Sequence, residues 1–414
     1  MPSYTGRSFD LFADGLAGFA FMPDHSSNPA AVHPRLAIGT CYAAMMVLAI
    51  AVNLMPVYLT AVSADLGGSE GLSKEKLGRI GAFTFVGLVT GILLCGPLAD
   101  RLGAKTFTLI GSGLIALGLG VLGLAHSYEQ VLVAVSIMGL GAGILDMILS
   151  PIVSALQPER RAIAMNWLHS FYCVGAVVTV LIATMALKIG VHWRTLALWM
   201  ALLPLAVGVS FLRLRLPPLV EESSTRLPVR ALLKERFFLV ALTAIFFGGA
   251  AEMGMAQWLP AYTELDLGMS RWVGGMALVA FSIAMALGRI VVGVLNGRVP
   301  TYTIMLWSCW SSVVLFIIAS ASPWHWTALL AGVLVGFTGS CLWPSTLAVT
   351  ADRFPLGGAS MFALLAAAGN LGGIGMPWAV GAIADGHTLA LGLSTATICP
   401  FLMAFLLMWM RRQP

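Results

Sequence analysis

Twelve long apolar stretches divide this chain, and they constrain its fold more than any other feature. About 20 consecutive apolar residues cross the hydrocarbon core of a bilayer as one helix, and each stretch is close to that length. In chain order they cover residues 36–62, 80–98, 106–125, 131–156, 162–187, 195–212, 237–259, 272–295, 302–321, 326–349, 359–384 and 389–410. The sequence therefore predicts an all-α membrane protein with twelve transmembrane helices.

The composition excludes other classes of protein. Of 414 residues, 59% are hydrophobic and 10% are charged, whereas a soluble domain carries about 25% charged residues. The apolar runs are continuous, which argues against an outer-membrane barrel of alternating strands. The basic residues lie in short loops between the runs, so the net charge of +5 indicates membrane orientation and no nucleic-acid partner.

The loop charges predict how the chain is oriented. Sixteen Lys and Arg residues fall on the side that holds both termini and six fall on the other side. Cytoplasmic loops carry the excess of Lys and Arg, so we expect both termini in the cytoplasm and the protein in the inner (plasma) membrane. Residues 1–35 have no basic start followed by an apolar core, so we interpret them as a cytoplasmic tail and not a signal peptide.

An internal repeat divides the chain into two halves. Residues 213–236 are rich in charge and proline and predict a cytoplasmic linker between six-helix halves at 36–212 and 237–414. A shift of 197 residues aligns Gly91 with Gly288, Gly96 with Gly293, Arg101 with Arg298, Gly139 with Gly336 and Gly175 with Gly372. Two six-helix repeats in the same orientation predict a substrate site at the midplane between them.

The loop after the second apolar run resembles the signature of the major facilitator superfamily. It reads Gly-Pro-Leu-Ala-Asp-Arg-Leu-Gly-Ala-Lys over 96–105, and a degenerate copy occupies 293–298. The resemblance implies the major facilitator fold, with two pseudo-symmetric halves that expose the site to alternate sides. It also implies gating roles for Asp100, Arg101, Lys105 and Arg298, although basic residues here can also serve only to orient the chain. We expect Arg289, near a helix end, to reach interfacial water and to act in gating or packing.

A second set of motifs is similar to the fucose permease branch of that superfamily. It comprises residues 139–146 ending in Asp146, residues 166–171, Glu252 with 257–260, and Gly288-Arg289. The resemblance implies proton-coupled sugar uptake, with Asp146 matching a carboxylate that takes part in coupling. The branch also has a first-helix carboxylate, where the nearest polar residue here is Asn53.

Two carboxyl groups are predicted at membrane depth, on Asp146 and Glu252. An ionised Asp in that position costs about 2.5 kcal/mol or more, so each is expected to be neutral, paired or facing water. The functional hypothesis is proton loading and release. The structural alternatives are a protonated acid bonded to a backbone carbonyl for Asp146 and a lock between helices for Glu252. His169 suits a proton relay or a structural role.

The remaining polar and aromatic residues in the runs suit a sugar site. Amides bind hydroxyl groups and aromatic faces bind C–H surfaces, which makes substrate-binding candidates of Asn53, Asn166, Trp167, Gln257, Trp258, Trp343 and Asn370. Glycines with a proline near 248–260 and 369–377 favour interrupted helices, as at carrier binding sites. The glycines of the second stretch can instead serve only to permit close packing. Glu252 and Gln257 would diverge by about 140° on a regular helix, so we expect both to face the cavity only if that helix unwinds.

These observations predict a monomeric, proton-coupled sugar symporter without a metal, a cofactor or an enzyme activity. No Walker-type phosphate loop occurs, which excludes ATP-driven pumping by this chain alone. The six cysteines lie in apolar runs without metal-ligand spacing, as small buried side chains do. Two alternatives remain open: a proton-coupled exporter of amphipathic or drug-like compounds, and a transport-inactive membrane sensor or scaffold.

Overall fold

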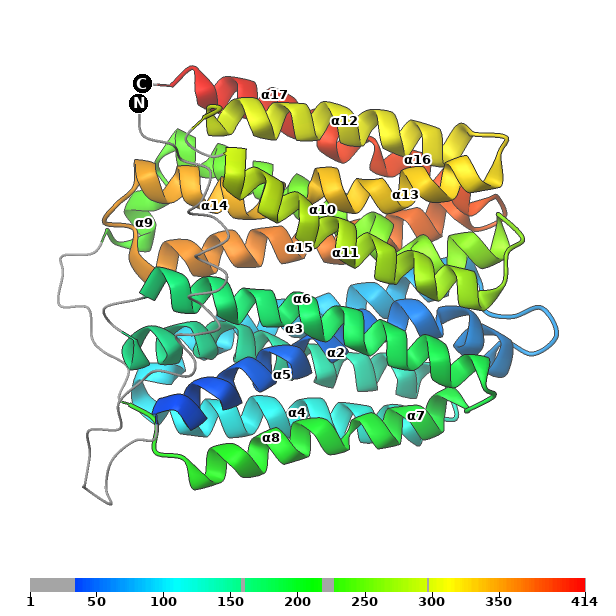
Figure 1. Cartoon of the computed structure of the whole chain (residues 1–414), viewed down its shortest axis with the longest axis horizontal. Coiled ribbons are helices and arrows are strands. Elements are labelled where there is room, and N and C mark those ends of the chain that lie inside the picture. The colour runs from blue at the N-terminus through cyan, green and yellow to red at the C-terminus, as the bar shows by residue number, and fades with distance from the viewer. Residues whose placement is uncertain (1–33, 158–160, 218–226, 296–297, 414) are drawn as a thin grey trace, which may run out of the picture.

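The computed structural model describes residues 34–157, 161–217, 227–295 and 298–413, apart from the side chains of 96–102, 161–163, 166 and 359. Within these residues, twelve helices are long and apolar enough to cross a membrane, as the sequence predicts. The first half contains α2 (Pro34–Leu66), α3 (Lys74–Leu102), α4 (Ala104–Gly123), α5 (Tyr128–Leu156), α6 (Arg161–Lys188), α7 (Trp193–Met200) and α8 (Leu202–Arg213). After the short α9 (Val229–Leu232), the second half contains α10 (Arg236–Leu265), α11 (Arg271–Leu295), α12 (Thr301–Ala321), α13 (His325–Gly339), α14 (Leu342–Arg353), α15 (Gly358–Ala384), α16 (Leu389–Ala396) and α17 (Ile398–Arg411). Figure 1 shows helices α2 to α8 gathered on one side and α10 to α17 on the other.

The helices repeat at the same offset as the sequence. Helices α3, α4, α5 and α6 begin at residues 74, 104, 128 and 161, and α11, α12, α13 and α15 begin at 271, 301, 325 and 358, each 197 residues later. Helix α3 packs on α15 and α6 packs on α11, so equivalent helices form the contact between the halves. The two six-helix units therefore share one backbone plan.

Three of the twelve spans are broken into two helices. The breaks lie at Ala201, at Ser340-Cys341 and at Thr397, and Pro204, Pro344 and Pro400 follow three to four residues later. A proline has no N–H for the carbonyl four residues before it, and its ring clashes with that carbonyl. The missing N–H is therefore part of the reason for each break. It is not sufficient, because the prolines inside α2, α5, α10 and α15 leave those helices continuous.

The predicted interruptions in the seventh and eleventh spans are wrong. Helices α10 and α15 are continuous, with Pro260 and Pro377 inside them. Their glycines instead allow close packing: a Cβ on Gly249 would lie 2.2 Å from the carbonyl oxygen of Gly369, and one on Gly372 would lie 2.3 Å from that of Phe246. Small residues let two helix backbones approach inside a membrane, and that packing explains the glycine-rich stretches.

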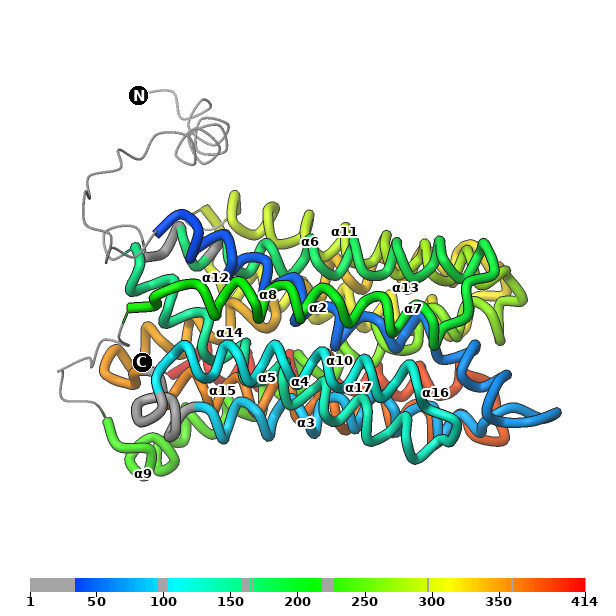
Figure 2. Tube along the Cα trace, turned by 90° about the horizontal axis from the view of Figure 1, so that it is seen from below, coloured from blue at the N-terminus to red at the C-terminus, as the bar shows by residue number. Residues whose placement is uncertain are grey.

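The bundle has two distinct ends. We call the end where α2 begins and α17 finishes the terminal end, and the other the opposite end (Figure 2). At the opposite end the Lys74 ammonium donates to the His387 carbonyl, and the Trp378 indole donates to Glu75 at 2.8 Å. Contacts between the halves thus hold this end closed.

The second pair of facing helices closes the opposite end in the same way. The Lys188 ammonium lies 4.0 Å from the centre of the Trp272 ring. A Cβ on Gly275 of α11 would come within 2.1 Å of the Thr184 hydroxyl of α6. These helices therefore touch without any space for a solute between them at this level.

Candidate functional site

A small closed cavity lies between the halves near the middle of the bundle. Its walls come from α2, α6, α10 and α11 and include Val52, Asn53, Pro56, Tyr172, Glu252, Met253, Ala256, Gln257, Leu278, Phe281, Ser282 and Met285. The space of about 10 Å³ is close to what one water molecule needs. Two helices of each half thus surround a polar centre at membrane depth, where the repeat places a site.

Glu252 is the acidic group of this cavity. It lies in the middle of α10, 16 residues from its first residue and 13 from its last (252 − 236 and 265 − 252), and only 8% of its surface is exposed. Among the described residues, none donates a hydrogen bond to its carboxyl group or pairs with it as a salt bridge. The charge of Arg289 acts on Glu252 across the space between α10 and α11.

Glu252 and Gln257 both line the cavity although α10 is a regular helix, so the expectation that α10 must unwind is wrong. Met253 and Ala256 lie between them and line it too, which gives a cavity-facing surface about 140° wide. The Gln257 amide donates to the Val52 carbonyl of α2 at 3.2 Å. That hydrogen bond joins the two halves at the cavity.

Asn53 and Tyr172 connect two helices of the first half. The Asn53 amide donates to the Ala49 carbonyl at 3.0 Å and to the Tyr172 hydroxyl at 3.3 Å. The sequence analysis missed Tyr172. It lies three residues after His169 on the same helix, and residues three apart share a helix face, so this spacing could have identified it.

Arg289 differs from its predicted position. Its Cα is six residues from the terminal end of α11 (295 − 289), but its guanidinium donates to the Met285 sulfur at 3.8 Å and to the Cys173 thiol of α6 at 3.3 Å. Side chains tilt toward the N-terminus of their helix, which here points the guanidinium toward the cavity. Arg289 therefore does not reach toward water at the near end.

Asp146 and His169 lie outside the cavity, on the first half. Asp146 is partly exposed and sits 10 residues from the end of α5 (156 − 146), nearer the terminal end than Glu252. Among the described residues, none forms a hydrogen bond or ion pair with it. His169 is exposed in the terminal half of α6, within electrostatic range of Arg289. Of the two residues, His169 is thus close enough to Arg289 to feel its charge, and no such interaction is found for Asp146 within the described part of the chain.

Most of the predicted sugar-binding aromatic residues pack between helices. Trp258 is fully buried, and its indole donates to the Pro377 carbonyl at 2.9 Å. Trp343 lies over Gly369 and Gly249, and Trp167 packs against a core cluster that has residues from both halves. The Asn370 amide donates to the Ala366 carbonyl of its own helix at 2.9 Å. Of the predicted binding residues, Asn53 and Gln257 line the cavity.

Of the predicted gating residues, Lys105 and Arg298 lie at the terminal end. The Lys105 ammonium donates to the Leu212 carbonyl at 2.7 Å, which ties the start of α4 to the end of α8, and Arg298 is exposed after α11. The side chains of Asp100 and Arg101, and that of the predicted binding residue Asn166, lie outside the described residues. Their roles stay predictions.

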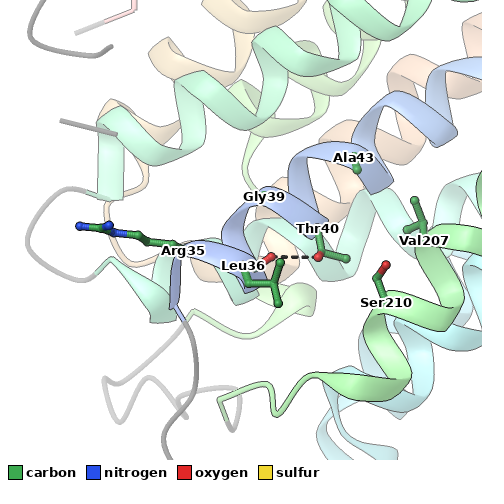
Figure 3. A pocket seen from close by; sticks show the side chains of 7 residues that line it. All are labelled: Arg35, Leu36, Gly39, Thr40, Ala43, Val207 and Ser210. Carbon is green, nitrogen blue, oxygen red and sulfur yellow. Dashed lines mark hydrogen bonds between the residues drawn. The ribbon is translucent and has the colours of Figure 1, made fainter. Parts of the chain in front are cut away.

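A larger hollow of about 490 Å³ lies at the terminal end between α2 and α8 (Figure 3). Its lining is Arg35, Leu36, Gly39, Thr40, Ala43, Val207 and Ser210. The hydroxyls of Thr40 and Ser210 donate to carbonyls of their own helices at 2.8 Å and 2.9 Å. This hollow is open and lies within the first half, so we do not include it in the candidate site.

Comparisons with known proteins agree with this architecture. A family model described as Major Facilitator Superfamily matches residues 36–310. The chain is 27% identical over 354 residues to a putative niacin/nicotinamide transporter of Bacillus subtilis, covering 80% of this chain and 84% of the relative. It is 25% identical over 382 residues to the cis,cis-muconate transport protein of Acinetobacter baylyi, covering 86% and 89%. Its fold matches that of the transporter FucP in the outward conformation with a TM-score of 0.63 and 18% identity, covering 91% of this chain and 99% of that one.

Proposed function

The chain belongs to the Major Facilitator Superfamily, and from this premise we propose that it is a proton-coupled carrier that takes up a small polar solute by alternating access. The observation that carries the proposal is the closed cavity between the halves, with Glu252 in its wall. A carboxyl group at membrane depth is energetically costly, so its presence there marks a functional site. We assign proton binding to Glu252, and the two halves that meet at the cavity are the bodies that move relative to each other.

The conformation supports one stage of such a cycle. Contacts such as Lys74 to His387 and Lys188 to Trp272 close the opposite end, while His169, in the terminal half of α6, is exposed. The Lys and Arg excess predicts that the terminal end faces the cytoplasm. The structure then corresponds to a carrier that is closed to the outside.

Glu252 and Arg289 supply a coupling mechanism. An ionised Glu252 attracts the Arg289 guanidinium, whereas a protonated Glu252 does not. A proton that enters from outside and binds Glu252 would therefore release Arg289 from this attraction. When the proton leaves to the cytoplasm, Glu252 is ionised again and the attraction returns. Asp146, nearer the terminal end, would serve as a second proton-binding group on the exit side.

The cavity lining and the relatives bear on which solutes are candidate substrates. The resemblance to the fucose permease branch favours a sugar, and Asn53 and Gln257 line the cavity in support. However, the amide N–H groups of both already donate to backbone carbonyls, and Trp258 packs away from the cavity. The relatives named for niacin/nicotinamide and muconate extend the candidates to small aromatic or acidic solutes.

The proposal is tested by transport into proteoliposomes that contain the purified full-length chain. Labelled solutes are screened with an inward proton gradient, an inward sodium gradient or neither. We expect accumulation of a small polar solute with the proton gradient only. Accumulation driven by sodium alone would overturn the coupling, expulsion of amphipathic compounds without uptake would favour the exporter, and no flux under any gradient would favour a sensor or scaffold.

A further inference from the structure

The guanidinium of Arg289 lacks an acidic partner within the protein. It has five N–H donors, and its Nε is buried with no hydrogen-bond partner. Its other contacts are two sulfur atoms, of Cys173 and Met285, and sulfur is a weak acceptor. Among the described residues, no carboxylate lies within ion-pair distance of it.

Two other cations near the ends of spans, Arg194 and Arg271, have acidic partners. The Arg194 guanidinium pairs with Asp65 at 2.5 Å and donates to the Ala125 carbonyl, also at 2.5 Å. Arg271 pairs with Glu264 at 3.1 Å and donates to the Thr60 hydroxyl at 3.1 Å. The sulfur contacts of Arg289 are weaker than either set, although Arg289 is only partly exposed and a cation withdrawn from water needs compensation.

Arg289 lies beside the cavity, although it is not one of the residues that line it. Met285, which it contacts, lines the cavity, and so does Tyr172, the neighbour of Cys173. The charged and titratable groups that face it are Glu252 on α10 and His169, Tyr172 and Cys173 on α6. Glu252 is the acidic one among them, and it stays beyond ion-pair distance.

From this placement we infer that Arg289 binds the carboxylate of the transported solute, so that the substrate is a small organic monocarboxylate and not a neutral sugar. The planar guanidinium matches a carboxylate with two parallel hydrogen bonds. One unpaired cation suits one anionic group. Val52, Leu278 and Phe281 of the cavity wall then contact the uncharged body of the solute. This inference rests on the proposed carrier function and names its substrate class.

The test compares acids with neutral molecules of the same shape. The purified full-length chain in detergent is heated with gluconate, lactate or benzoate, and in parallel with glucose, lactamide or benzamide, with sodium chloride to match ionic strength. A solute that binds the folded state raises its unfolding temperature. We expect at least one acid to raise it and its neutral counterpart not to do so.

Variants then assign the effect to Arg289. In Arg289→Gln the acid should bind at least about tenfold more weakly, a loss of about 1.4 kcal/mol, and Arg289→Lys, which keeps the charge, should retain part of the binding. Arg230→Gln, which removes an exposed positive charge near α9, is the matched control and should bind as the wild type does. Unfolding temperatures without solute, compared between Arg289→Gln and Arg289→Lys, show whether the first variant folds.

The outcomes separate this inference from the proposed function. The inference is overturned if no acid raises the unfolding temperature, if glucose, lactamide or benzamide raises it as much as the acids do, or if Arg289→Gln binds the acid as the wild type does. Glucose uptake that is driven by a proton gradient and unchanged in Arg289→Gln would support the proposed carrier function and overturn the carboxylate site at Arg289. Acid binding that depends on Arg289, without any gradient-driven flux, would support the carboxylate site and overturn the carrier function.

Discussion

The same helix contact occurs in both halves of the molecule, 197 residues apart. A Cβ on Gly139 of α5 would lie 2.0 Å from the Thr84 carbonyl oxygen of α3, and a Cβ on Gly336 of α13 would lie 2.6 Å from the Phe281 carbonyl oxygen of α11. Thr84 and Phe281 are themselves 197 positions apart. The pair that joins Gly91 to the Leu140 carbonyl likewise has its counterpart in Gly288 and the Phe337 carbonyl.

The polar groups at membrane depth do not follow this repeat, although Arg101 and Arg298 near the span ends do. Shifted by 197 residues, Glu252 corresponds to Met55, Arg289 to Ile92, Asp146 to Trp343 and Tyr172 to Gly369. The two halves therefore share their packing and differ in their chemistry. The repeat thus builds the frame, and we expect the positions that break it to carry the chemistry of transport.

The largest effect should follow from Glu252→Gln. The change keeps the size of the side chain but removes both the titrating group and the charge that acts on Arg289. We expect gradient-driven uptake and solute exchange both to fall to the level of protein-free liposomes. Glu264→Gln, on the same helix but at the opposite end with Arg271, is the control and should transport. Normal exchange in Glu252→Gln would show that the cavity carboxyl is not needed.

Asp146→Asn, in the first half, should abolish solute accumulation but not solute exchange. Asp146 does not line the cavity, and no described residue is bonded to it, so its removal should leave solute binding intact. We expect solute exchange without a gradient to continue at a rate of the same order as in the wild type, while accumulation stops at equal concentrations inside and outside. If Asp146→Asn instead loses exchange as Glu252→Gln does, the two carboxyl groups do not have separate roles.

The smallest effects should be those on packing, and they should be equal in the two halves. Gly139→Ala and Gly336→Ala each force a methyl group against a backbone carbonyl, and overpacking of this kind costs about 1–3 kcal/mol. Both should lower the unfolding temperature in detergent by similar amounts. Gly113→Ala in α4, with open space at its Cβ, should not lower it. A loss confined to one half would contradict the equivalence of the two contacts.

The number of spans and the repeat could be predicted from the sequence because each depends on local composition and on spacing along the chain. Residues such as Glu252 could be found as well, since a carboxyl group inside an apolar run stands out. The sequence could not reveal the contacts between halves. That the Arg289 guanidinium lies against Cys173, or that Trp258 bonds to Pro377, depends on side-chain direction and on which helices meet.

The wrong prediction of interrupted helices at α10 and α15 also arises because the outcome depends on which helices meet. Glycine and proline in a membrane helix permit either unwinding or close packing, and the partner helix decides between them. Here Gly249 meets Gly369 across the α10–α15 contact, so both helices stay intact. The three breaks occur in other spans, each three to four residues before a proline. A proline does not decide between the two outcomes either, since Pro260 and Pro377 lie inside continuous helices.

Two of those breaks, at Ala201 and Thr397, lie in the last span of each half, and both spans carry exposed apolar residues such as Leu202, Leu205, Ile398 and Phe401. We expect these side chains to face the acyl chains of the surrounding lipid. A bend at either break would change the hydrophobic length that the span presents, and mismatch with the bilayer costs free energy. We therefore expect bilayer thickness and lateral pressure to shift the balance between the conformations of this carrier.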